Sequence, residues 1–176
     1  MNSGCGVRVL SPKGAITPTG TWSLGARAGD FVFVAGMRGI NPANNSLVEG
    51  EEARIRQAFT NMKLIAESAG ANLPDCVRLT VFVTDMDRLR PLVNKVQEEL
   101  WTGGPYPPRT IVEVTALNQN DFFEVEGTFY SPKTGEIGNA SWVGGVFRDT
   151  YIGERGGCAA QQDGIPWASS NSSTTK

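Results

Sequence analysis

Arg109 and Glu124 are the residues whose types and spacing point most directly to chemistry. Arg109 follows the run Pro105-Tyr106-Pro107-Pro108 and opens a short apolar stretch. Because proline fixes φ and biases the residue before it toward extended geometry, this loop should present Arg109 with little conformational freedom, as suits a binding arginine. Glu124 lies inside the next predicted strand. An equally open alternative is that neither residue is functional. In that case one strand simply begins with a surface arginine, and the next carries two solvated glutamates.

Histidine is absent from the chain, and this excludes several classes of active site. Ser-His-Asp and Cys-His nucleophilic arrangements, histidine-ligated zinc and histidine acid/base pairs all need that residue. The three cysteines, Cys5, Cys76 and Cys158, are far apart and form no CxxC pair, so they indicate neither a disulfide framework nor a thiolate metal site. Cys76 opens an apolar run and is predicted to be a small buried hydrophobe.

Length, composition and charge predict one domain with an appendage. With 176 residues, of which 40% are hydrophobic, the chain can bury a substantial core. The net charge is −2 and basic residues are scattered, which favours neither nucleic acid nor a membrane surface as a partner. The sequence has no signal-peptide pattern and no run of about eighteen apolar residues, so a soluble, cytoplasmic protein is expected.

The elements that must position Arg109 and Glu124 follow from hydrophobic periodicity. Strands are predicted at residues 7 to 10, 22 to 26, 30 to 36, 75 to 84, 110 to 114 and 122 to 129. The alternation in the fourth of these places four residues on one face, namely Val77, Leu79, Val81 and Val83. Stripes with a period near 3.6 predict helices at residues 51 to 70, with Gly70 as the stop, and 89 to 101, with Pro91 in the first turn.

This order of elements predicts a mixed α+β sheet of six strands with both helices on one face. The strand at residues 30 to 36 is apolar on both sides, and the chain offers no further strong helix for the second face. We therefore expect another copy of the chain to bury that face, with a pocket between subunits. A simple hairpin of the last two strands would leave Glu124 about 13 Å along the strand from the position opposite Arg109.

Several segments resemble the RidA family, also called the YjgF/UK114 family. They are residues 32 to 42, 70 to 87 and 107 to 127, which include Thr80-Val81-Phe82-Val83-Thr84-Asp85-Met86 and Pro107-x-Arg109-Thr-x-Val-Glu-Val. The resemblance spans roughly residues 7 to 130, so residues 1 to 130 are assigned to a RidA-like domain. It implies a chorismate-mutase-like fold, a homotrimer with clefts between subunits, and a last strand inserted elsewhere in the sheet. The implied activity is hydrolysis of reactive enamines and imines, such as 2-aminoacrylate, to a 2-keto acid and ammonia.

The resemblance also implies roles for individual residues. Arg109 matches the substrate-binding arginine, whose guanidinium can hold the carboxylate of a 2-imino acid through two parallel hydrogen bonds. Glu124 matches the glutamate that orients the attacking water and takes its proton. Gly36 and Asn94 match a cleft glycine and a pocket asparagine; their alternatives are a strand end and an exposed helix residue. No metal or organic cofactor is required, because imines hydrolyse readily once oriented.

The pocket positions depart from the family pattern. Trp22 stands where tyrosine is common, Ala35 where serine is common and Ile111 where cysteine is common. Met37 and Arg38 belong to a segment that is commonly Gln-Ile-Pro. The loss of hydroxyl groups and the gain of larger apolar groups predict a pocket that is reshaped and holds less water. The alternative for Trp22 is that it is an ordinary aromatic residue of the core. Arg38 is either a cation for a second substrate carboxylate or a surface residue.

These departures leave the substrate open between small 2-imino acids and a larger imine or enamine, of the aminomuconate type or from a specialised biosynthetic pathway. A non-catalytic trimer that binds small acids is another alternative, in which Glu124 has no use as a base. RNA cleavage, also attached to this family, is disfavoured by the acidic balance and the missing histidine. Residues 131 to 176 lie outside the resemblance. Their first half is expected to pack through Trp142, Val143, Val146, Phe147, Tyr151 and Ile152, and residues 153 to 176 are expected to be disordered.

Overall fold

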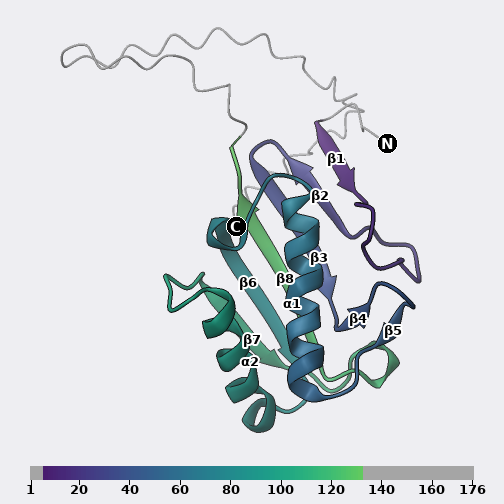
Figure 1. Cartoon of the computed structure of the whole chain (residues 1–176), viewed down its shortest axis with the longest axis vertical. Helices are drawn as coiled ribbons and strands as arrows, with labels where there is room; N and C mark the ends of the chain where they lie inside the picture. The colour runs from purple at the N-terminus through teal and green to yellow at the C-terminus, as the bar shows by residue number, and fades with distance from the viewer. Residues whose placement is uncertain (1–5, 133–176) are drawn as a thin grey trace, which may run out of the picture. The chain divides into compact units, whose positions relative to one another are not determined.

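The computed structural model describes residues 6 to 132, which form a six-stranded sheet with two helices on one face (Figure 1). The sheet contains β1 (Val7–Leu10), β2 (Gly25–Ala28), β3 (Phe31–Met37), β6 (Cys76–Val83), β7 (Arg109–Glu113) and β8 (Phe123–Tyr130). The helices are α1 (Glu51–Glu67) and α2 (Met86–Leu100). A small second sheet, β4 (Ile40–Asn41) with β5 (Ser46–Leu47), was not predicted. The expectations for residues 133 to 176 lie outside the described residues.

The strand order is β1-β2-β3-β8-β6-β7, so the last strand lies in the middle of the sheet. β6 and β7 are parallel, with Leu79 opposite Arg109, whereas β8 is antiparallel to both β3 and β6. The parallel pair is possible because α2 carries the chain back between β6 and β7. The predicted mixed α+β sheet is therefore confirmed, and β7 and β8 do not form the hairpin considered above.

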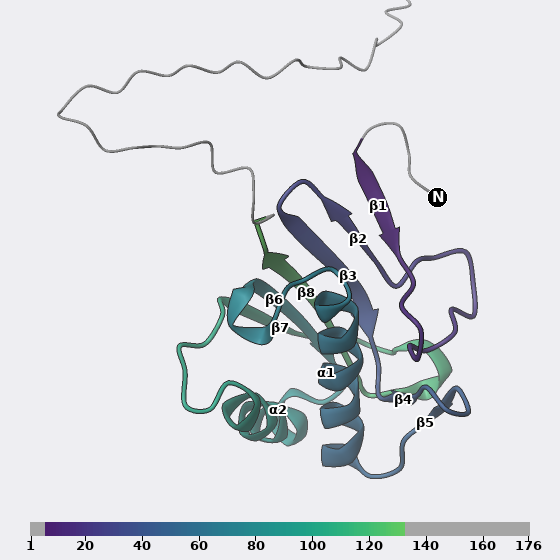
Figure 2. The same cartoon turned by 45° about the horizontal axis from the view of Figure 1, so that its top comes forward.

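The core lies between the helices and one face of the sheet (Figure 2). α1 packs chiefly on β3 and β8. The core residues on α1, β6 and β8 include Ile55, Phe59, Met62, Leu79, Val81, Val83, Phe123 and Val125. The prediction that Val77 shares the buried face was wrong, because its side chain is 43% exposed. The pairing of β6 with β8 shifts between Cys76 and Arg78, and such a bulge turns the neighbouring side chain to the other face.

Helix ends follow local chemistry. α1 ends at Glu67, before Gly70, whose φ of 86° suits the glycine after a helix. α2 begins three residues earlier than predicted, because the Asp85 side chain accepts a hydrogen bond from the backbone N–H of Arg88. Pro91 therefore lies inside the helix rather than in its first turn. The Glu113 carboxylate accepts the Met86 N–H at 2.7 Å and so ties β7 to α2.

Within residues 6 to 132, no helix or second sheet covers the opposite face of the sheet (Figure 2). We call the apolar residues Phe31, Phe33, Val112 and Tyr130 on this side the open face, and each is at least 38% exposed. The Phe31 ring packs against Phe33 and Tyr130, with centroids 6.3 and 5.4 Å away. Cys76 is buried, as predicted, and burial raises the pKa of its thiol to about 12. Within the described residues, no helix has the length and apolar character needed to cross a bilayer.

Candidate functional site

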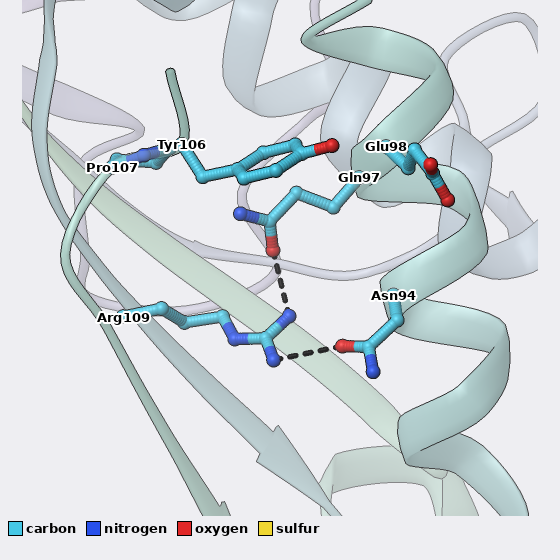
Figure 3. A pocket seen from close by; sticks show the side chains of 6 residues that line it. All are labelled: Asn94, Gln97, Glu98, Tyr106, Pro107 and Arg109. Atoms are coloured by element: carbon cyan, nitrogen blue, oxygen red, sulfur yellow. Dashed lines mark hydrogen bonds between the residues drawn. The ribbon is translucent and has the colours of Figure 1, made fainter. Parts of the chain in front are cut away.

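Arg109 is the first residue of β7 and reaches toward α2 (Figure 3). Its Nη1 donates to the Gln97 side-chain oxygen at 2.7 Å, and its Nη2 donates to that of Asn94 at 2.8 Å. Asn94 and Gln97 are three residues apart on a helix and so share a face. The loop before Arg109 is docked by a hydrogen bond of 2.9 Å from the Leu79 N–H to the Pro108 carbonyl. The guanidinium is thus held in one plane from two sides.

A cavity of about 440 Å³ surrounds this guanidinium, and we call it the Arg109 pocket. Its lining residues are Asn94, Gln97, Glu98, Tyr106, Pro107 and Arg109. Burial, and secondarily the charge of Arg90, lowers the pKa of Arg109, although a guanidinium stays protonated at neutral pH. Arg109 has neutral acceptors and no ion pair among the described residues. Its positive charge therefore remains available to an anionic group.

Glu124 lies in a different cavity, of about 280 Å³, which we call the Glu124 pocket. Its lining residues are Ile16, Thr19, Trp22, Ala35, Gly36, Arg38, Ile40, Asn118 and Glu124. The Glu124 carboxylate lies against the backbone of Gly36, where a built Cβ would fall 2.6 Å from the carboxyl carbon. Only glycine leaves that space, which gives Gly36 a role beyond ending a strand.

The environment of Glu124 raises the pKa of its carboxyl group above the usual value. Burial raises the pKa of Glu124, the charges of Asp121 and Glu126 raise it further, and the charge of Arg38 opposes them. A carboxylate with a raised pKa is a stronger base than a solvated one once it is ionised. Glu124 can therefore hold a water molecule and accept its proton.

A single chain does not bring Arg109 and Glu124 together. Glu124 on β8 lies opposite Phe82 on β6, which in turn lies opposite Val112 on β7. Because Val112 comes three positions after Arg109, Arg109 and Glu124 are separated by two strand spacings and three positions along β7. The separation of their Cα atoms is about 14 Å from ordinary sheet dimensions. Because side chains alternate along a strand, this offset of three also places the two side chains on opposite faces of the sheet. Arg109 shares its pocket with Asn94, and Glu124 shares its pocket with Trp22, Ala35, Gly36 and Arg38.

The other residues predicted to line a pocket lie in different surroundings. Met37 is fully buried in the core and lines neither pocket. Ile111 packs partly against the core on the same face as Arg109, and it also lines neither pocket. Trp22 is not a core aromatic, because it is 38% exposed and lines the Glu124 pocket. Arg38 is not a surface residue, because it is 6% exposed.

Sequence reasoning missed Gln97, Tyr106 and Asn118. Gln97 is 4% exposed, and its position three residues after Asn94 was the signal that could have identified it. Tyr106 lies in the proline-rich loop already singled out. Asn118 contributes through the turn before β8, and no sequence pattern marks it. Among residues 6 to 132, no group of three or more His, Cys, Asp or Glu side chains is arranged to hold a metal ion.

Comparison with known proteins places this geometry in a family. Residues 12–130 match the family model described as Endoribonuclease L-PSP. A 2-iminobutanoate/2-iminopropanoate deaminase from Dermatophagoides farinae is 34% identical over 122 residues, which cover 68% of this chain and 92% of that protein. The deaminase of the same name from Salmonella typhimurium is 30% identical and covers 68% of this chain and 94% of its own length.

Two solved structures show the same fold. A Rhodopseudomonas palustris protein described as a probable translation initiation inhibitor is 56% identical, covers 72% of this chain and 98% of its own, and superposes with a TM-score of 0.70. RidA from an Antarctic Psychrobacter is 32% identical, covers 70% of this chain and 98% of its own, and gives a TM-score of 0.67. The chain therefore belongs to the RidA/YjgF family, whose family model is described as Endoribonuclease L-PSP.

Proposed function

We propose that this protein is an imine deaminase that hydrolyses a reactive imino acid, or its enamine tautomer, to the keto acid and ammonia. The observation that carries the proposal is the state of Arg109, a guanidinium held between Gln97 and Asn94 with no anionic partner among the described residues. Such a group is prepared for a substrate carboxylate. The names of the relatives from Dermatophagoides and Salmonella support the reaction class.

The proposed site is shared between chains of a homotrimer. Within one chain, Arg109 and Glu124 belong to different pockets on opposite faces of the sheet, so a site that contains both needs a second copy. The open face, with Phe31 and Phe33 43% and 46% exposed, supports association through apolar surface. Arg109 of one subunit would then face Glu124 of its neighbour across a cleft.

In the proposed reaction, Arg109 binds the substrate carboxylate through two N–H groups and fixes the plane of the C=N bond. Glu124 orients a water molecule and accepts its proton as the oxygen attacks the imine carbon. Glu124 returns this proton to the imine nitrogen, which gives a carbinolamine with one new C–O bond. Transfer of the hydroxyl proton to the amino group accompanies cleavage of the C–N bond, which releases ammonia and leaves the keto acid. Oxidation states do not change in these steps.

The primary experiment couples the protein to a pyridoxal-phosphate-dependent serine or threonine dehydratase, which generates 2-imino acids in the assay. Semicarbazide competes for the imine, so the deaminase is measured as faster keto-acid formation and less semicarbazone. Arg109→Ala should remove this acceleration, and Arg109→Lys should restore it only weakly, because an ammonium cannot reproduce the planar fork. Equal rates for wild type and Arg109→Ala would exclude small imino acids as substrates.

A panel of larger imines and enamines follows if the small imino acids fail. Trp22, Ala35 and Ile40 line the Glu124 pocket, and their apolar surface supports a substrate with a bulkier side chain. Turnover of a larger imine with loss in both Arg109→Ala and Glu124→Gln would support a deaminase of different specificity. Failure across the panel, combined with carboxylate binding that depends on Arg109 alone, would favour a non-catalytic acid-binding protein.

The shared site is tested by co-expressing Arg109→Ala and Glu124→Gln chains with different affinity tags and isolating mixed assemblies. In a closed ring of three, every mixed trimer contains one interface with both residues intact, so about one third of the wild-type activity should return. Each variant purified alone is the control and should be inactive. If Arg109 and Glu124 acted from the same chain, the mixed assemblies would stay inactive.

A further inference from the structure

Three charged side chains, Arg38, Arg54 and Asp121, form a group beside Glu124 that we call the charge cluster. The Asp121 side chain is fully buried. Its Oδ1 accepts hydrogen bonds from Arg54 at 3.3 Å and from the Phe122 N–H at 2.8 Å. Arg38 Nη1 lies 3.7 Å from Oδ2, and this oxygen has no hydrogen-bond partner among the described residues. The carboxylate therefore does not form a closed, bidentate pair with Arg38.

Arg38 is the member of the charge cluster that lines the Glu124 pocket. Its Nη1 donates to the Asn118 carbonyl at 2.8 Å, and its Nη2 donates to the Gln119 side chain at 2.9 Å. Both acceptors are neutral, so these bonds hold the guanidinium in place without cancelling its charge. Arg54 is directed elsewhere, because it bonds the Val48 carbonyl and its guanidinium lies over the Phe122 ring at 4.7 Å.

The charges of the cluster do not balance. Two guanidinium groups face one buried carboxylate, which leaves one excess positive charge next to the Glu124 pocket. A charge at a half-buried site acts more strongly on a neighbour than it would in water. Glu124 is the carboxylate that shares the pocket with Arg38 and is therefore the group on which this excess charge acts most directly.

We propose that Arg38 is a positioning residue for Glu124, whose charge keeps the half-buried carboxylate ionised and thereby sets the lower pH limit of the reaction. The inference rests on the proposed role of Glu124 as the base. The charged groups that act on Glu124 are Arg38, which lowers its pKa, and Asp121 and Glu126, which raise it in the same direction as burial. Removing the charge of Arg38 should therefore favour the protonated acid, and removing that of Asp121 should favour the carboxylate.

The direct test is a titration of the Glu124 carboxyl group by NMR on protein with carbon-13 in the glutamate side chains, with Glu124→Gln used to assign the signal. In Arg38→Met the titration midpoint should move to higher pH, and in Asp121→Asn it should move to lower pH. Two matched variants separate charge from structure. Arg38→Lys keeps the positive charge but loses the planar guanidinium, and Gln119→Ala removes the acceptor of Arg38 Nη2 without removing a charge. In both variants the titration midpoint of Glu124 should stay close to that of wild type.

The outcomes decide the proposal even if one variant does not fold. Equal midpoints in wild type and Arg38→Met, or equal shifts in Arg38→Met and Gln119→Ala, would overturn it. If Arg38→Met does not give a folded protein by circular dichroism, the midpoint of Arg38→Gln decides, because this variant removes the same charge and a merely structural role of Arg38 predicts no shift toward higher pH.

The kinetic test is the pH profile of kcat/KM in the coupled assay. Arg38→Met should displace the acid side of the profile upward by about half a pH unit, a threefold loss at low pH, while the plateau at high pH stays near wild type. An unmoved acid limb would contradict the proposal. If the wild type hydrolysed no imine, the proposed function would fail, whereas the NMR shifts would still decide whether Arg38 controls the ionisation of Glu124.

Discussion

The burial of Glu124 determines how the proposed reaction should depend on pH. Because burial raises the pKa of this carboxyl, the ionised form needed for a base is lost at a higher pH than for a solvated glutamate. We therefore expect kcat/KM to be constant above the raised pKa and to fall as the pH drops through it. Glu124→Gln should lower kcat by about 10² to 10⁴-fold, the usual contribution of a positioned base, and leave a profile without this acid limb. A variant that kept the limb would show that another group titrates.

Gly36 gives a second prediction at the same scale. Its φ is not positive, so alanine is tolerated by the backbone, but the added Cβ would overlap the Glu124 carboxylate. The carboxylate is the end of a flexible side chain and can move, so we expect Gly36→Ala to lower kcat at least tenfold with little change in thermal stability. The double variant Gly36→Ala/Glu124→Gln should be no slower than Glu124→Gln alone. A further loss in the double variant would show that Gly36 acts by another route.

Individual site residues could be predicted from sequence where a motif fixed them, and not where three-dimensional packing decided. Arg109, Asn94, Gly36 and Glu124 were named, and each lines a pocket. Met37 was named because it neighbours pocket residues along the strand, but the irregular pairing of β3 with β8 between Val34 and Met37 breaks the alternation and turns its side chain into the core. Asp121 was not named at all, because a lone aspartate before a strand looks like a turn residue until its two arginine neighbours are known.

At the scale of elements, the side chain of Asn61 joins α1 to the segment that follows β3 and to β4. Asn61 is 4% exposed, and its Nδ2 donates to the Arg38 carbonyl at 3.0 Å and the Ile40 carbonyl at 2.8 Å. A Cβ at Gly39 would fall 2.8 Å from the carbonyl carbon of Arg54, so the helix and this segment are in backbone contact. Asn61 therefore satisfies two carbonyls that water cannot reach.

Asn61→Ala should consequently lower the free energy of unfolding by about 2 kcal/mol, because it removes both hydrogen bonds that Nδ2 donates, leaves the Arg38 carbonyl with only the Ile40 N–H as donor and creates a small cavity. Thr60→Ala is the matched control, since Thr60 is the exposed neighbour on the same helix, and it should change stability by less than about 0.5 kcal/mol. Urea denaturation at one fixed protein concentration measures both, because association also contributes to stability. Equal midpoints for the two variants would contradict this role of Asn61.

The types of the long elements were predictable, and their connections were not. The helices and β6 have strong periodic patterns, and each was found within a few residues of its predicted bounds. The bulge near Val77 and the short strands β4 and β5 depend on pairing partners distant in sequence, which periodicity does not contain. The insertion of β8 elsewhere than beside β7 was expected from the family resemblance alone, because the spacing of β7 and β8 is equally compatible with a hairpin.

At the scale of the whole molecule, the two pockets and the open face support the proposal that one chain alone does not form the complete site. The Arg109 pocket does not contain Glu124, and the Glu124 pocket does not contain Arg109. The open face exposes aromatic side chains that pack on one another and have no cover within the described chain. A symmetric assembly would bring the two pockets together and cover the open face at the same time.

Phe33→Glu tests this link between assembly and activity. Phe33 is 46% exposed in the single chain, so a charge there should leave the fold intact but oppose burial of the open face, where Glu126 is already close. We expect sedimentation to show a smaller species than wild type and activity to fall with the fraction of dissociated protein, recovering in part at high protein concentration. Thr60→Glu adds the same charge on the helix side and should change neither property. Full activity in a dissociated Phe33→Glu protein would mean that one chain suffices, and the shared site would have to be abandoned.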